Sequence, residues 1–372
     1  MKICSPVFCS ALILASLAVP GLAQQAKPSS AKVKESAESQ FARQNLKDVL
    51  NAVDAAWFGK TYQGVTSVDL TGTLKIELSA AAMNAKAESA GQGAVKGKLT
   101  KGANVNVKLK TTYFANADFR TEFTGEFGDM LYYRSGNRGF LYSKDQNAYT
   151  TKVEPPPSDA PVSFLGWFRQ CINEIQAVYV DGGSFRAALG REAGGGNQQT
   201  LIFNSPTSKY DPKKREQSMA ESLGFWKKGR LEVVFDKATK LPQSMNFSNE
   251  GQGIATQMTF AYLPGGKVHS ITISNQSKGM EGPASMQISY GGDGLMNHIA
   301  GEMGFSQGRL NFDMDMAWSN SKKPSAIVTI PPPGATKKGR EEMETMLLVN
   351  LAGKVLDLQH SGFNLRSVTL TN

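Results

Sequence analysis

Histidine and cysteine are scarce in this 372-residue sequence, which has three of each. His298 and His360 stand alone, without Cys, Asp or Glu at ligand spacing. His269 shares one face of a predicted strand with Ile271 and Ile273, so we expect it to be packed or to lie at the rim of the core. The histidines therefore predict neither a metal site nor a catalytic base.

Sequence motifs that carry known chemistry are missing as well. There is no G-x-S-x-G elbow, H-E-x-x-H helix, P-loop or G-x-G-x-x-G after a predicted strand. Asp313 and Asp315 share one strand face and could bind a cation or act as acid and base, but no third ligand lies near them in sequence. A solvated strand face is the simpler interpretation. We therefore expect no cofactor, no metal and no enzymatic activity.

Long apolar runs are also absent. The longest, Val7 to Val19, is shorter than the roughly 20 residues that span a bilayer. It follows Lys2 and precedes Gly21-Leu22-Ala23, as in a secretory signal peptide that is cleaved after Ala23. We expect residues 1–23 to be this signal peptide and residues 24–35, rich in Gln, Lys, Ser and Pro, to be a flexible tether. The mature protein is then periplasmic and soluble, with association with the outer membrane as the alternative.

Signal cleavage also changes the cysteine count and the net charge. It removes Cys4, Cys9 and Lys2, so the net charge falls from +9 to +8 and Cys171 is the one cysteine left. One cysteine cannot form an intramolecular disulfide, so the core alone must hold the fold together. Cys171 lies at helical spacing from apolar residues such as Ile175, and we expect a buried, inert thiol.

Positive charge is concentrated in two stretches of the sequence. In the cell envelope the acidic partners are anionic lipid head groups and envelope polymers, so an anionic membrane surface is a candidate partner and nucleic acid is not. Solvated surface lysines are the alternative interpretation. The residues concerned are Lys96, Lys98, Lys101, Lys108 and Lys110, and then Lys213, Lys214, Arg215, Lys227, Lys228 and Arg230.

Apolar periodicity predicts one helix followed by many strands. Apolar residues at three- and four-residue intervals predict an amphipathic helix over 36–57 that stops at Gly59. The period then changes to two, and strands over 70–78 and 105–110 lead into an antiparallel meander of short strands. The helix positions are Leu46, Val49, Leu50, Val53 and Trp57.

In the second half of the sequence, a second predicted sheet lies between two predicted helices. Alternating apolar residues over 229–330 predict a half-buried antiparallel sheet. A broadly apolar helix over roughly 164–179 precedes it, and a helix over roughly 338–356 and a strand near 363–370 follow it.

We therefore assign the sequence to the α+β class, mostly antiparallel β. We expect strongly curved half-barrel sheets covered by amphipathic helices, because an apolar sheet face must be covered. The chain divides into residues 36–180 and 181–372, or it forms one continuous domain.

The candidate functional site consists of the apolar sheet face and the predicted helix over roughly 164–179, which follows Pro155-Pro156-Pro157. If they leave a gap, it is a cavity for acyl chains, and if they pack completely, it is an ordinary core. Flexible methionines suit either role. The candidate ligand-binding residues are Phe164, Trp167, Phe168, Phe247, Met258 and Phe260.

One stretch resembles a known family. Residues 231–242 read Leu-Glu-Val-Val-Phe-Asp-Lys-Ala-Thr-Lys-Leu-Pro, similar to a strand that ends in Asp, a short polar turn and the Leu-Pro of the next strand in the periplasmic outer-membrane lipoprotein carrier superfamily (LolA/LolB-like). The order of elements over 36–330 is similar too, although this chain is much longer than one such domain. The resemblance implies a half-open barrel with a hydrophobic cavity that carries lipid or lipid-modified protein.

Our first hypothesis is thus an exported, non-enzymatic carrier or binding protein for a hydrophobic ligand in the cell envelope. The alternatives are a structural or interaction protein associated with the outer membrane, a barrel in that membrane, and an envelope hydrolase with an unrecognised site. The first hypothesis predicts binding of a lipid or lipoprotein, and the last predicts turnover of a substrate.

Overall fold

The computed structural model describes the chain in segments. These are residues 36–59, 62–79, 103–114, 118–125, 128–135, 138–151, 172, 175–180, 189–204, 229–249, 254–275, 284–305, 308–321, 331–339 and 342–343. The predicted signal peptide and tether, Cys171, His360, the last strand and most of the two later helices lie outside these segments. The described residues belong to two compact units, each with its own strands.

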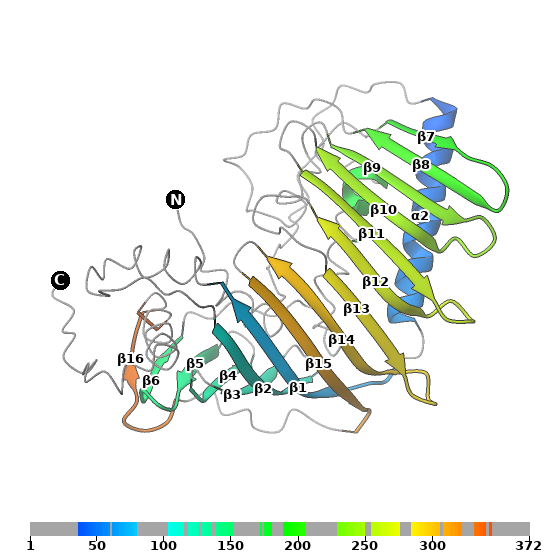
Figure 1. Cartoon of the computed structure of the whole chain (residues 1–372). Helices are drawn as coiled ribbons and strands as arrows, with labels where there is room; N and C mark the ends of the chain where they lie inside the picture. Colours follow the sequence, from blue (N-terminus) through cyan, green and yellow to red (C-terminus); the bar gives the residue numbers. More distant parts are fainter. Residues whose placement is uncertain are drawn as a thin grey trace. The chain divides into compact units, whose positions relative to one another are not determined.

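Unit 1 is a β-sheet in which all but one of the strand pairs are antiparallel (Figure 1). The strand order is β16-β6-β5-β4-β3-β2-β1-β15. The exception is the pair of β16 and β6, which is parallel. The strands are β1 (Ser67–Leu78), β2 (Ala103–Phe114), β3 (Phe119–Gly125), β4 (Met130–Ser135), β5 (Arg138–Ser143), β6 (Ala148–Thr150), β15 (Gly308–Ser319) and β16 (Thr336–Lys337).

Unit 2 combines an antiparallel meander with a long helix. Its strand order, β7-β8-β9-β10-β11-β12-β13-β14, is the order of the sequence, because each strand pairs with the next. The elements are α2 (Ala37–Phe58), the π-helical turn η3 (Gln176–Val180), β7 (Leu189–Ala193), β8 (Gln198–Asn204), β9 (Arg230–Asp236), β10 (Pro242–Asn249), β11 (Ile254–Tyr262), β12 (Val268–Asn275), β13 (Ala284–Tyr290) and β14 (Met296–Phe305).

The mostly antiparallel β class that the sequence predicted is therefore observed, with α2 as the long helix of the described segments. The two units interleave along the chain, whereas the sequence suggested consecutive parts divided near residue 180. The helix 37–58 belongs with β7–β14, and β15 belongs with β1–β6.

The predicted N-terminal helix is confirmed together with its ends. Ser36 is the N-cap, and its Oγ accepts a hydrogen bond from Ser39 N at 3.1 Å. Gly59 N donates to Ala55 O at 3.1 Å, and a Cβ on Gly59 would lie 2.5 Å from that oxygen, so a glycine ends the helix here. The predicted apolar stripe is buried throughout: Ala42, Leu46, Val49, Leu50, Val53 and Trp57 are each at most 1% exposed.

The core of unit 1 follows the predicted alternation. On β1, Leu74 and Ile76 are buried while Lys75 between them is exposed. Gly72 lies in the middle of β1, where a Cβ would be 2.1 Å from Asp313 O and 2.7 Å from Met314 Cγ. A glycine is therefore needed for β15 to approach β1 here, and the Met314 side chain takes the space.

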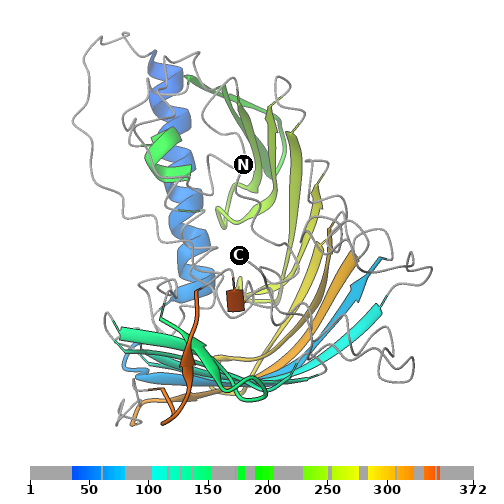
Figure 2. The ribbon, with the colours of Figure 1, turned by 90° about the vertical axis from the view of Figure 1, so that its left-hand side faces the viewer.

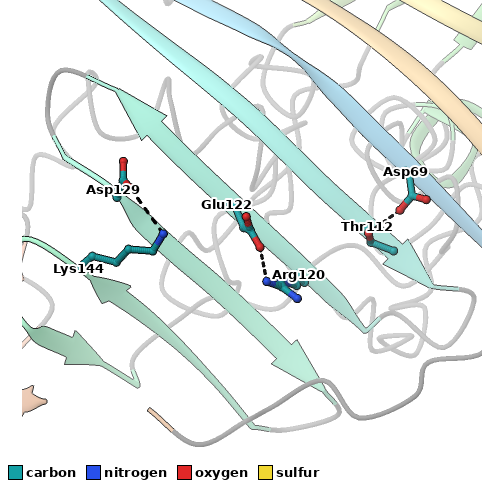
Figure 3. A network of polar contacts seen from close by, with 6 residues as sticks. All are labelled: Asp69, Thr112, Arg120, Glu122, Asp129 and Lys144. Atoms are coloured by element: carbon teal, nitrogen blue, oxygen red, sulfur yellow. Dashed lines mark hydrogen bonds and ion pairs between the residues drawn. The ribbon is translucent and has the colours of Figure 1, made fainter. Parts of the chain in front are cut away.

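Polar contacts lie on the other face of unit 1. Figure 3 shows three of them: Thr112 donates to Asp69, Arg120 pairs with Glu122, and Lys144 Nζ lies 3.6 Å from Asp129 Oδ2. These pairs are partly or largely exposed, and such contacts add little to stability.

The described members of the first basic cluster, Lys108 and Lys110, are exposed on β2. Lys110 lies opposite Glu122 on β3 and Thr71 on β1. Lys108 lies opposite Thr124 and Thr73. This part of the cluster therefore has threonines and an acidic residue beside it.

Candidate functional site

One face of the unit 2 sheet is apolar from β8 to β14. Because the strands pair in register, side chains of this inner face form rows that cross several strands. One row is Leu201, Val233, Met245, Met258, Ile273, Ala284 and Met303, and the row beside it contains Phe260, Ile271, Met286 and Gly301.

Burial on this inner face is complete on some strands and partial on others. At the β8–β9 end, Leu201 and Val233 are completely buried. On β12–β14, Ile271 and Ile299 are buried as well, whereas Ile273, Met286 and Met303 are only half-buried. These three side chains leave apolar surface open for another apolar group.

Three of the sequence-predicted site residues lie together on this face. Phe247 on β10 is 2% exposed, and Met258 and Phe260 on β11 are 8% and 6% exposed. Met258 pairs directly with Met245 of β10. The other three, Phe164, Trp167 and Phe168, lie outside the described residues, so the structure does not place them.

Helix α2 runs across the strands of unit 2 (Figures 1 and 2). Near its beginning, Ser39 Oγ accepts a hydrogen bond from Gly190 N of β7 at 3.1 Å. Just after its end, Tyr62 Oη accepts one from Met296 N of β14 at 3.2 Å. Helix α2 and the residues that follow it therefore reach from the first strand of unit 2 to the last.

The contact between α2 and β7 depends on a glycine. A Cβ on Gly190 would lie 2.3 Å from Cε1 of Phe203 and 3.0 Å from Cβ of Ala42. Phe203 and Ala42 are both fully buried, so neither can move away easily. Gly190 thus sets how closely the helix approaches the sheet.

Arg43 joins α2 to the segment before β7. Its Nη1 donates hydrogen bonds to the backbone oxygens of Tyr179, at 3.0 Å, and Val180, at 3.2 Å. Arg43 is 8% exposed and Tyr179 is completely buried. A cation therefore donates to two backbone carbonyl groups at the end of η3.

A polar cluster lies between α2 and the sheet. The amide nitrogens of Asn45 and Gln199 both donate to the carboxylate of Glu192, and Lys240 Nζ donates to Asn45 Oδ1 at 3.1 Å. Asn45, which is 7% exposed, thus links a carboxylate on β7 to an ammonium group beyond β9. Lys240 Nζ also lies 5.1 Å from the ring centre of Phe235, a cation–π distance.

The turn that holds Lys240 is part of the stretch that resembles the carrier superfamily. Asp236 Oδ1 accepts hydrogen bonds from Ala238 N, Thr239 N and Thr239 Oγ1 at 2.8–3.0 Å. These bonds, led by that from the Thr239 backbone, lower the pKa of Asp236. Lys240 has a φ of 60°, an uncommon backbone conformation, and its side chain reaches Asn45 on α2.

Two tyrosine hydroxyl groups bond to backbone oxygens at the end of the unit 2 sheet that carries the Lys240 turn. Tyr262 Oη donates to Pro242 O at 2.7 Å and Tyr290 Oη to Val268 O at 2.8 Å. Burial raises the pKa of Tyr62 to about 12 and also raises the pKa of Tyr262 and Tyr290. Lys267 Nζ donates to Gly294 O at 2.8 Å and lies 5.0 Å from the ring centre of Tyr290.

The position of His269 differs from the sequence-based expectation. The pairing of β11 with β12 shifts register between Ala261 and Tyr262, so Val268, not His269, takes the buried position facing Tyr262. His269 is exposed, with Nδ1 3.3 Å from Ile288 O. The predicted alternation holds for Ile271 and Ile273. A bulge at His269, which the sequence does not reveal, changes which residues face inward at this end of β12.

The carboxylate pair lies where the sequence placed it. Asp313 and Asp315 are exposed on β15, opposite the buried side chains of Phe312, Met314 and Met316. Among the residues that the structure describes, no group of three or more His, Cys, Asp or Glu side chains could hold a metal ion.

Sequence analysis missed the residues that attach α2 to the sheet. Arg43, Asn45 and Glu192 appeared as ordinary polar positions, because their partners are far away in sequence. Lys240 carried a signal, since it lies within the one stretch with motif-level similarity, but its contact with Asn45 depends on the fold.

Comparisons by sequence find no match. No model of a known protein family matches the chain, and no curated protein matches it in sequence. No helix in the described segments is both long and apolar enough to cross a membrane.

Several solved structures are similar to the chain. A putative outer-membrane lipoprotein-sorting protein domain from Vibrio parahaemolyticus is 11% identical, over 76% of this chain and 95% of its own, with a TM-score of 0.28. A LolA superfamily protein from Nitrosomonas europaea is 8% identical, over 75% and 94%, with a TM-score of 0.28. A DUF1329 family protein from Desulfovibrio piger is 8% identical, over 77% and 96%, with a TM-score of 0.29. Two of these structures carry names from the superfamily that residues 231–242 resemble, and the likeness is distant, with TM-scores of 0.28.

Proposed function

We propose that this protein is an exported, non-enzymatic carrier that binds a hydrophobic ligand, a lipid or the lipid-modified part of a protein, in the cell envelope. The binding surface is the inner face of the unit 2 sheet. The helical segment with Phe164, Trp167 and Phe168 completes it, and Phe247, Met258 and Phe260 form its floor. In this proposal the sheet is one wall of a half-barrel.

The observation that carries the proposal is the apolar surface that stays open on the inner face. Ile273, Met286 and Met303 of β12–β14 are only half-buried, although they share this face with buried residues such as Ile271. Each methylene of an acyl chain that reaches such a surface contributes about 0.8 kcal/mol of binding free energy. Flexible methionine side chains can repack around chains of different shape.

The composition and the site agree with binding and not with catalysis. Most described side chains of the inner face are apolar, with the buried Thr256 as an exception, and the polar groups at its end, such as Asn45, Glu192 and Lys240, bond to one another. The resemblance of residues 231–242 to periplasmic lipoprotein carriers, and the predicted signal peptide, support a periplasmic location for this binding.

The test is to purify the mature protein from the envelope fraction and to analyse its organic extract by mass spectrometry. A fluorescent fatty acid is then titrated into the delipidated protein. The proposal predicts a co-purifying lipid and saturable binding of the probe. Absence of both would show that the inner face is a filled core.

A further inference from the structure

Two half-buried lysines lie at one end of the proposed binding face, and we propose that they bind the anionic head group of an amphiphilic ligand. The inference rests on the proposed function and names its ligand class: a molecule with an apolar tail and a carboxylate or phosphate head.

The position of the two lysines follows from the meander. Lys240 lies in the turn between β9 and β10, and Lys267 lies in the turn between β11 and β12. In an antiparallel meander, alternate turns lie at the same end of the sheet, so the two ammonium groups share the end that also carries the turn 291–295.

Each ammonium group lies against the inner face. Lys240 Nζ lies over the ring of Phe235, which is completely buried and lies opposite Pro242 of β10. Lys267 Nζ lies over the ring of Tyr290, which faces Met296, also completely buried. The cations therefore lie at one end of the inner face, and the half-buried Met286 lies further along the same face of β13, four residues before Tyr290. A tail that starts at the cations would run along the strands to reach it.

The partners of these cations are uncharged. Lys240 donates to the amide oxygen of Asn45, and Lys267 donates to the backbone oxygen of Gly294. Neither residue takes part in the ion pairs of the described part of the chain. A lysine has three N–H donors, so each ammonium group retains donors for an anion.

The nearby carboxylate of Glu192 does not replace such an anion. It accepts hydrogen bonds from the amides of Asn45 and Gln199, and Asn45 separates it from Lys240 in the chain of hydrogen bonds. An anionic head group would thus meet Lys240 and Lys267 first.

The experiment compares a fluorescent fatty acid with its methyl ester, which has the same tail and no charge. The wild-type mature protein should bind the acid about tenfold more tightly than the ester, because charge-assisted hydrogen bonds form with the acid alone. The double variant Lys240→Gln/Lys267→Gln should lose this preference and keep its affinity for the ester. Lys240→Arg/Lys267→Arg, which retains both charges, should keep the preference.

Lys237→Gln is the matched control, because Lys237 is exposed in the same turn as Lys240. It should bind both probes as the wild type does. Millimolar inorganic phosphate should fail to displace the acid, because the tail supplies most of the affinity.

The outcomes separate the two proposals. Equal binding of acid and ester by the wild type, or a preference that survives in the glutamine double variant, would overturn the head-group assignment while leaving a binding face. Binding of neither probe would instead remove the proposed function itself.

Discussion

Arg43 of α2 donates a hydrogen bond to the backbone oxygen of Tyr179, which lies 136 residues later in the chain. A second bond reaches Val180 O, so one side chain fixes both carbonyl groups at the end of η3. Residues Tyr179 and Val180 are thereby held to helix α2.

Replacing Arg43 with Met should therefore weaken unit 2. The variant keeps an apolar stem but leaves two buried or half-buried carbonyl groups without their donor, which costs about 2 kcal/mol of unfolding free energy. Urea unfolding of the mature protein measures this loss. Lys47→Met is the control, because Lys47 is exposed on the same helix and should change stability by less than about 0.5 kcal/mol. Equal stability of the two variants would mean that the Arg43 contacts contribute nothing.

Gly190→Ala should also destabilise the protein. The added methyl group would lie 2.3 Å from Phe203 and 3.0 Å from Ala42, so α2 and β7 must move apart at a cost of about 1–3 kcal/mol. The control is Gly195→Ala in the following turn, where nothing lies within 4 Å of the new methyl group. Thermal unfolding should show a lower Tm for the first variant alone, and a Tm equal to that of the wild type would contradict the close approach.

Alkaline pH should destabilise the fold through its buried tyrosines. Tyr62 has its pKa raised from 10.0 to about 12, so the folded state keeps this hydroxyl protonated where the unfolded state ionises it. The stability that results is complete below pH 10 and is lost as the pH rises towards 12. Tyrosinate absorbance followed against pH, together with unfolding curves, checks this. In Tyr62→Phe the decrease between pH 10 and 12 should be smaller.

Asp236 should show the opposite dependence on pH. Hydrogen bonds from Thr239 lower its pKa below the usual 3.8, so these bonds stabilise the turn above that pH and weaken as the pH falls through the lowered pKa. A carbon-13 NMR titration of the side-chain carboxyl group measures the shift. Thr239→Val removes the hydroxyl donor and should raise the pKa of Asp236 towards 3.8, and an unchanged titration curve would argue against this bond.

The inner face should be sensitive to charge and the outer face should not. Met286 is half-buried on the inner face of β13, and Gln287, its neighbour, is exposed on the other face. Met286→Glu should weaken binding of a fluorescent fatty acid at least tenfold, because the carboxylate would have to be desolvated against the tail. Gln287→Glu should bind as the wild type does. Equal affinities of the two variants would place the ligand elsewhere.

The sequence predicted the elements of this fold better than their arrangement. The spacing of Leu46, Val49 and Val53 identified α2, and alternation identified the strands, because both patterns are local consequences of burying one face. The partners of α2 and of the residues after it were not predicted, since the contacts of Ser39 with Gly190 and of Tyr62 with Met296 join residues more than 100 positions apart. No local pattern encodes such pairs.

The candidate site was predicted in the same partial way. Phe247, Met258 and Phe260 do share the inner face, as strand alternation required. His269 was placed on the wrong face because a bulge adds a residue to β12. The groups that complete the end of the site, Asn45 and Lys240, come from a helix and a turn that meet only in the folded chain.

Photo-crosslinking with a diazirine-labelled fatty acid tests the central claim most directly. The probe is bound to the mature protein, irradiated, and the labelled peptides are identified by mass spectrometry. We predict that labels fall on the inner-face side chains of β10–β14, such as Met258 and Met286, and that excess unlabelled fatty acid abolishes them. Labels confined to outer-face residues such as Gln257 and Gln287, or labels that unlabelled fatty acid does not compete away, would contradict binding at this face.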